Sequence, residues 1–115
     1  MNYDLANALA KQIRESQEAQ EYKRLREIVE ESDTTKALLK EYKRLQMVVQ
    51  MAAMSGQSLP GDEMSRFQQI SSLLYSGTDT SAFLLAEIRL QQALADIYNL
   101  IAQAAGIKLE LPGIE

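Results

Sequence analysis

The chain has 115 residues, 46% hydrophobic and 24% charged, with a formal net charge of −4, so it suits one modest folded domain and disfavours non-specific binding to nucleic acids. It contains neither cysteine nor histidine, which excludes disulfides, thiolate metal sites and imidazole acid–base catalysis by this chain. No apolar run is long enough to span a bilayer, and the first residues lack the features of a signal peptide, so we expect a cytoplasmic protein. We also expect no cofactor.

The N-terminal part of the chain predicts two short helices. Asp4 is a candidate N-cap for a first helix that runs to about Glu15. Ser16 is the next candidate N-cap, and the helix that follows it ends before Glu31. Because Ser16 is the only break signal between them, the segment is either two helices or one bent helix.

Residues 34–54 predict the long helix around which the rest of the chain is organised. Apolar side chains recur in it at alternating steps of four and three, at Leu38, Tyr42, Leu45, Val49 and Ala52. This spacing places them on one narrow stripe, which we call the inward stripe and which is typical of a helix that packs against another helix. Ser32 or Asp33 is positioned to cap the helix, and a loop with Pro60-Gly61 follows it.

Two further helices are predicted in the second half. Asp62 is the candidate cap of the first, which stops at the polar segment 75–79. The second spans about 79–105 and ends before Gly106. It repeats the alternating four and three spacing at Leu90, Leu94, Ile97, Ile101 and Ala104. Residues 106–115 are expected to form a loosely ordered tail.

These elements predict an all-α bundle of about five helices in a single domain, residues 1–105. The long helices at 34–54 and 79–105 are expected to pack antiparallel, each with its shorter neighbour. One copy of so small a bundle would leave apolar surface uncovered, so we expect a homo-oligomer, most simply a dimer.

One short sequence occurs twice. Residues 21–25 and 41–45 both read Glu-Tyr-Lys-Arg-Leu. Each copy lies on a predicted helix. Duplication of a helical unit and convergence on helix-forming residues both remain open as explanations.

The central helix also carries a candidate interaction surface. Three of its methionines recur at steps of four and three. Such flexible side chains suit a surface that accepts protein partners. The alternative is that they fill the monomer core or a fixed dimer interface. Basic residues nearby could meet RNA or an acidic protein, but the acidic neighbour Glu41 favours a solvated face with intrahelical pairs. The candidate surface comprises Met47, Met51, Met54, Lys36, Lys40 and Arg44.

Glu87 is an acidic residue on the apolar phase of the last helix. It could be a buried acid, or it could pair with Arg44 or Arg89. The sequence offers no second acid beside it, no glycine-rich phosphate loop and no nucleophile elbow. We therefore interpret Glu87 as a structural ion pair or an edge residue and predict that the protein is not an enzyme.

Several segments together carry a family resemblance. They are the opening Tyr-Asp-Leu-Ala-Asn-Ala-Leu-Ala of residues 3–10, the capped segment from Ser16 to Tyr22, residues 37–46, the turn at 54–56 and the pattern of residues 86–97. Over residues 3–105 the chain resembles the YlbF/YmcA/YheA family of small helical proteins, known chiefly from Gram-positive bacteria.

The resemblance implies a self-associating helical protein without enzymatic activity. Relatives act in a protein complex that influences ribonuclease Y-dependent mRNA processing, and through it competence, sporulation and biofilm formation. Some carry C-terminal cysteines linked to iron–sulfur clusters, whereas this chain has no cysteine, so that cofactor is not carried over and the ribonuclease connection stays open. We predict a cytoplasmic adaptor that regulates through protein contacts and binds no DNA or membrane. The alternative is an RNA-binding module that uses the basic patch from Lys36 to Arg44.

Overall fold

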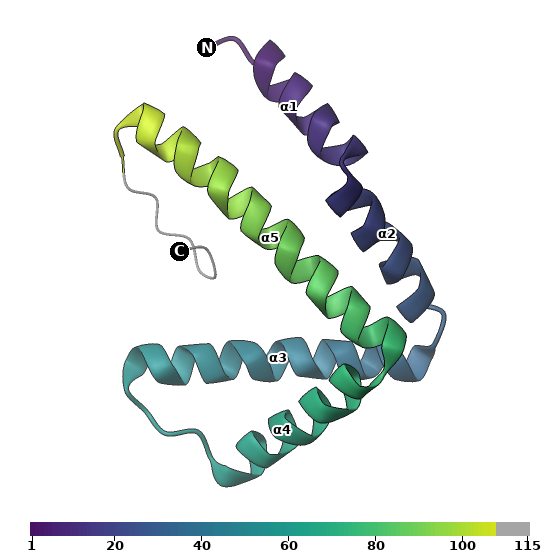
Figure 1. Ribbon diagram of the computed structural model, residues 1–115. Coiled ribbons are helices and arrows are strands. Elements are labelled where there is room, and N and C mark those ends of the chain that lie inside the picture. Colours follow the sequence, from purple (N-terminus) through teal and green to yellow (C-terminus); the bar gives the residue numbers. More distant parts are fainter. Residues whose placement is uncertain (108–115) are drawn as a thin grey trace. The chain divides into compact units, whose positions relative to one another are not determined.

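The computed structural model describes residues 1–107 (Figure 1). They form α-helices and no strand: α1 (Asp4–Glu15), α2 (Gln17–Val29), α3 (Asp33–Ser55), α4 (Gly61–Ser76) and α5 (Thr78–Ala105). The all-α fold predicted from the sequence is confirmed. No helix in this part of the chain combines the length and the apolarity needed to cross a membrane. The predicted tail lies, from residue 108 onward, outside the described residues.

The helices fall into two compact units. Among the described residues, the terminal unit combines Met1–Leu25 with residues 83–107, and the central unit is Arg26–Ala82. Within the central unit, α3 packs against α4. The antiparallel pairing of α3 with α5 and the single domain of residues 1–105 stay predictions.

Serine side chains cap two helices where the sequence predicted them. Ser16 Oγ accepts a hydrogen bond from the Ala19 N–H at 3.2 Å, and Ser32 Oγ accepts one from the Thr35 N–H at 3.2 Å. Ser16 has an extended backbone, with ψ 154°, so α1 and α2 are two helices and not one bent helix. Each cap satisfies a helix N–H group and contributes about 1 kcal/mol.

Two predicted acidic caps are wrong, because each acid lies inside its helix. Asp4 begins α1, and its N–H donates to Asn2 Oδ1 at 2.9 Å. Asp62 lies in the first turn of α4, which begins at Gly61 after Pro60. Both carboxylates still favour the positive end of the helix dipole.

Glycines with positive φ end the two long helices. Gly56 (φ +72°) follows α3, and Gly106 (φ +75°) follows α5 as predicted. A tight turn closes α5, in which the Gly106 N–H donates to Gln103 O at 3.1 Å and the Ile107 N–H donates to Ala102 O at 3.3 Å. The left-handed conformation that this turn requires costs glycine no steric strain.

The apolar stripes of the two long helices differ in how far they are covered. On α3, Tyr42 and Leu45 are buried and the rest of the inward stripe is half-buried. On α5, Leu94 and Ile101 are 39% and 54% exposed. The stripe of α3 therefore builds the core, while much of the stripe on α5 remains at the surface.

The repeated sequence makes the same kind of contact in each unit. Tyr22 stacks on Phe83 in the terminal unit, with ring centroids 5.4 Å apart, and Tyr42 stacks on Phe67 in the central unit at 5.5 Å. The leucine that ends each copy is buried. The repeat thus places one aromatic contact and one core leucine in each unit.

Candidate interaction surface

The outward side of α3 carries lysines in its first half and methionines in its second. We call this set the Lys–Met stripe: Lys36, Lys40, Lys43, Met47, Met51 and Met54. Every member lies nine residues from a member of the inward stripe, and nine residues are about two and a half helical turns. The Lys–Met stripe therefore runs along the opposite side of the helix from its core face.

The side chains of this stripe are largely in solvent. Met47 and Met51 are each 63% exposed and Met54 is 86% exposed. Lys36 and Lys40 are exposed as well, while Lys43 is half-buried. Because all three are exposed, the interpretation that the methionines fill the core of one copy is wrong, and their contact with a partner or with a second copy stays a prediction.

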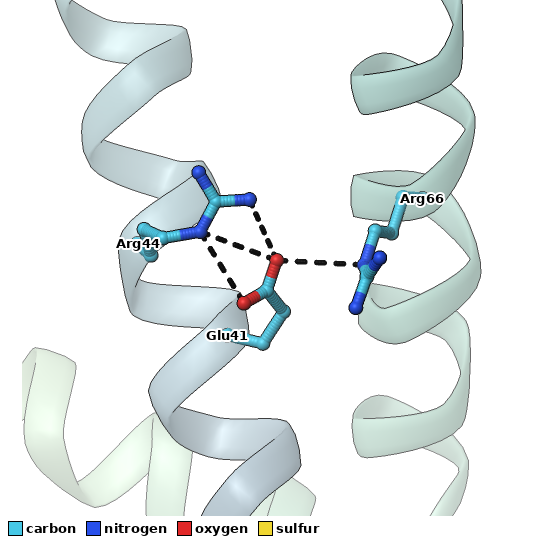
Figure 2. A network of polar contacts seen from close by, with 3 residues as sticks. All are labelled: Glu41, Arg44 and Arg66. Atoms are coloured by element: carbon cyan, nitrogen blue, oxygen red, sulfur yellow. Dashed lines mark hydrogen bonds and ion pairs between the residues drawn. The ribbon is translucent and has the colours of Figure 1, made fainter.

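Arg44 lies beside the stripe and is held by an acidic neighbour (Figure 2). Its Nη2 lies 2.7 Å from Glu41 Oε1 in an i,i+3 ion pair. Arg66 of α4 approaches the same carboxylate, with Nε 3.4 Å from Glu41 Oε1. Glu41 therefore links α3 to α4, and Arg44 is less available to a partner than Lys36 or Lys40.

The same network sets the protonation of its members. The hydrogen bond from Arg44 holds the pKa of the Glu41 carboxyl below its ordinary value, opposed by slight desolvation and aided by the charges of Arg44 and Arg66. In return, the hydrogen bond to Glu41 raises the pKa of Arg44. Because the two arginine side chains are 51% and 63% exposed, water screens these pairs and they add little to stability.

In the first copy of the repeat, Arg24 forms the equivalent ion pair with Glu21. Arg24 Nη2 lies 2.6 Å from Glu21 Oε1, and this hydrogen bond lowers the pKa of the Glu21 carboxyl. Intrahelical pairing therefore accounts for an arginine in each copy, as the sequence predicted for much of the basic patch.

Glu87, the acid on the apolar phase of α5, is half-buried. It accepts a hydrogen bond from Tyr22 Oη at 3.4 Å. The carboxylate partner that the structure gives to Arg44 is Glu41, and the pairing of Glu87 with Arg44 or Arg89 stays a prediction. The sequence did not predict the role of Tyr22, because no local pattern marks a partner on a distant helix.

A hollow of about 400 Å³ lies between α2 and α5 in the terminal unit, lined by Gln17, Glu18, Glu21, Ala86 and Arg89. One of its carboxylates, Glu21, is already paired with Arg24. Within residues 1–107, no group of three or more His, Cys, Asp or Glu side chains is placed to hold a metal ion.

A second exposed surface lies on the later part of α5. Its apolar residues, which we call the α5 face, are Leu94, Leu100 and Ile101, at 39%, 66% and 54% exposed. In the same unit α1 has no buried residue, and its Leu5 is 85% exposed. Exposed apolar side chains therefore occur on two helices of the terminal unit.

Comparison with known proteins gives both a family and a fold. The family described as "Control of competence regulator ComK, YlbF/YmcA" matches residues 2–105. Among curated proteins, a UPF0342 protein of Caldicellulosiruptor saccharolyticus is 29% identical, over 97% of this chain and 93% of its own length. A UPF0342 protein of Halothermothrix orenii is 30% identical, over 86% of this chain and 84% of its own.

Among solved structures, the chain is similar to a protein of unknown function (DUF964) from Bacillus stearothermophilus. The TM-score is 0.71 at 20% identity, covering 90% of this chain and 91% of the other, so this likeness concerns the fold alone. The family match extends over nearly the whole described chain and agrees with the resemblance found in its sequence. The protein therefore belongs to the YlbF/YmcA family, whose description names control of the competence regulator ComK.

Proposed function

We propose that the chain is a non-enzymatic cytoplasmic adaptor that forms a homodimer and regulates by binding other proteins. The observation that carries the proposal is the α5 face, whose side chains are 39% to 66% exposed in a single copy. Exposed apolar side chains on a helix gain free energy when a second helix covers them.

The gain can be set against the cost of association. Fully burying one Leu or Ile side chain contributes about 1.5–3 kcal/mol. In a symmetric dimer each residue of the α5 face counts twice. Association itself costs roughly 4–15 kcal/mol, so the partly exposed α5 face must be joined by further apolar surface. Leu5 of α1 is available for this, at 85% exposed.

The regulatory part of the proposal is supported by the family. Its description names control of a competence regulator, and a regulator without catalytic groups acts through what it binds. We place the adaptor in a protein complex that affects mRNA processing, competence, sporulation or biofilm formation.

Size-exclusion chromatography with light scattering tests the dimer at about 50 µM, a concentration at which a micromolar dimer is largely formed. The wild-type chain should have the mass of two copies, and Leu100→Glu with Ile101→Glu should have the mass of one. The matched control is Leu73→Glu with Leu85→Glu, since these leucines are 59% and 47% exposed and lie outside the α5 face. A monomeric wild type, or a control that dissociates equally, would contradict the proposal.

An RNA-binding module is the rival proposal. It is favoured by the exposed Lys36 and Lys40 and opposed by the net charge of −4 and by the pairing of Arg44 with Glu41. A gel shift with labelled single-stranded RNA that weakens steeply with salt and is lost on Lys36→Glu with Lys40→Glu would support it. No shift at low salt would end it.

A further inference from the structure

We propose that the Lys–Met stripe of α3 binds one acidic amphipathic helix of a second protein, with the acidic residues of that helix over the lysines and its apolar residues over the methionines. The inference rests on the proposed adaptor function and names the chemistry of its partner. It depends on how charge and apolar surface are divided along α3.

The stripe has two chemically different halves on one straight line. Lys36, Lys40 and Lys43 occupy its first half, and Met47, Met51 and Met54 its second. At 1.5 Å per residue, the line from position 36 to position 54 is about 27 Å long. A partner helix of about five turns matches that length. No glycine or proline interrupts α3 over this distance.

The lysine half selects negative charge. Lys36 and Lys40 are exposed, and neither forms an ion pair with another residue in the described part of the chain. The chain as a whole carries a net charge of −4, so an acidic partner is repelled by much of the surface and attracted to this half of the stripe. Such a contrast fixes where and in which orientation a partner docks.

The methionine half selects apolar side chains and disfavours acidic ones. The last turn of α3 contains no basic residue, so the negative end of its helix dipole is uncompensated there. The methionine side chains are flexible and polarisable, which lets them fit Leu, Ile or Phe side chains of different shape. The acidic residues of the partner therefore bind at the lysine half of the stripe, and its apolar residues bind at the methionine half.

Nucleic acids and lipid surfaces fit this stripe less well. The three exposed methionines offer no charge to an RNA backbone. The net charge of −4 would also repel its phosphates. An anionic membrane gains about 1 kcal/mol for each nearby Lys, which is little for two freely exposed lysines on an acidic chain. A helical protein segment uses both halves of the stripe at once.

Fluorescence anisotropy with two labelled synthetic peptides tests the proposal on the full chain. Each peptide is helix-forming, about 19 residues long to match the stripe, with Glu at helical spacing in one half and Leu in the other. The two differ in whether the Glu half comes first, so that both orientations of the partner helix are covered. One of them should bind with a Kd of about 10–100 µM.

Variants assign the binding to the stripe. Lys36→Glu with Lys40→Glu should weaken binding about tenfold, as should Met47→Gln with Met51→Gln. Raising NaCl from about 50 mM to about 300 mM should weaken binding to the wild type and should not weaken binding to the lysine variant. The charge-matched control is Lys11→Glu with Lys23→Glu, on exposed positions of α1 and α2. The apolar control is Leu73→Gln, at 59% exposed.

The outcomes separate this inference from the proposed function. Failure of both peptides to bind, or equal loss in the control variants, overturns the docking site even when light scattering shows a dimer. Binding of phosphatidylglycerol vesicles or single-stranded RNA in place of either peptide also overturns it. A chain that binds a peptide through the stripe but remains monomeric supports the inference and contradicts the dimer.

Discussion

The two copies of Glu-Tyr-Lys-Arg-Leu, one on α2 and one on α3, give the same local structure in different surroundings. In each copy the glutamate pairs with the arginine three residues on, at 2.6 Å and 2.7 Å. In each, the tyrosine stacks on a phenylalanine and the leucine is buried. In both helices the same five consecutive residues thus form one ion pair and, beside it, one stacked tyrosine and one buried leucine.

The copies differ in what the neighbouring helices add. In the central unit, Arg66 joins the ion pair and Tyr42 is buried at 7% exposed. In the terminal unit, Tyr22 is half-buried and donates a hydrogen bond to Glu87. The shared residues therefore determine which contacts form. The surrounding helices determine how far the tyrosine is buried and which further polar partners join.

The largest expected effect comes from truncating the buried leucines. Leu45→Ala and Leu25→Ala should each lower the free energy of unfolding by about 2–5 kcal/mol, because both leucines are almost completely buried, at 0% and 3% exposed. Urea denaturation at a fixed protein concentration measures both. A loss well below this range for one variant would show that the leucine of that copy contributes less to its core than its burial indicates.

The aromatic contacts should be alike in strength. A double-mutant cycle with Tyr42→Leu and Phe67→Leu should give a coupling energy of about 0.5–1.5 kcal/mol. The cycle with Tyr22→Leu and Phe83→Leu should agree with it within about 0.5 kcal/mol, because the ring centroids are 5.5 Å and 5.4 Å apart. A measurable coupling energy in one unit and none in the other would mean that the repeated sequence alone does not determine the strength of the tyrosine–phenylalanine contact.

Features coded by neighbouring residues could be predicted from the sequence. The serine caps, the glycine that ends α5 and the inward stripe of α3 all depend on positions within one or two helical turns. The acidic caps were misplaced because several residues near a helix start can serve its N–H groups. At α1, Asn2 Oδ1 accepts the hydrogen bond from the Asp4 N–H, and a local pattern does not rank Asn2 against Asp4.

Features made between helices could not be predicted in the same way. Nothing in the sequence joins Arg66 to Glu41, or Tyr22 to Glu87, because each pair lies on two helices whose relative placement is set by packing. Similarly, the stripe of α5 and the stripe of α3 look alike as sequence, since core and contact surfaces both use apolar residues at helical spacing. Their difference in exposure had to come from the structure.

The smallest expected effect concerns the two ion pairs, which differ because Arg66 joins the pair on α3. Arg44→Gln should raise the pKa of the Glu41 carboxyl, because the hydrogen bond from Arg44 is the main cause of its lowering. Arg66→Gln should raise it by less and should leave the Glu21 carboxyl unchanged, since the lowering of the Glu21 pKa comes from Arg24 alone. Carboxyl ¹³C shifts followed by NMR across acidic pH measure both groups in one sample.

The direction of the effect on stability follows from the same shifts. A carboxyl whose pKa is lower in the folded chain than in the unfolded chain stabilises the fold at neutral pH. That contribution is lost as the pH falls through the pKa of the folded state. The wild-type chain should therefore lose slightly more stability on acidification than the variant with both Arg24→Gln and Arg44→Gln. Identical acid dependence of the two proteins would show that solvent screens both pairs completely.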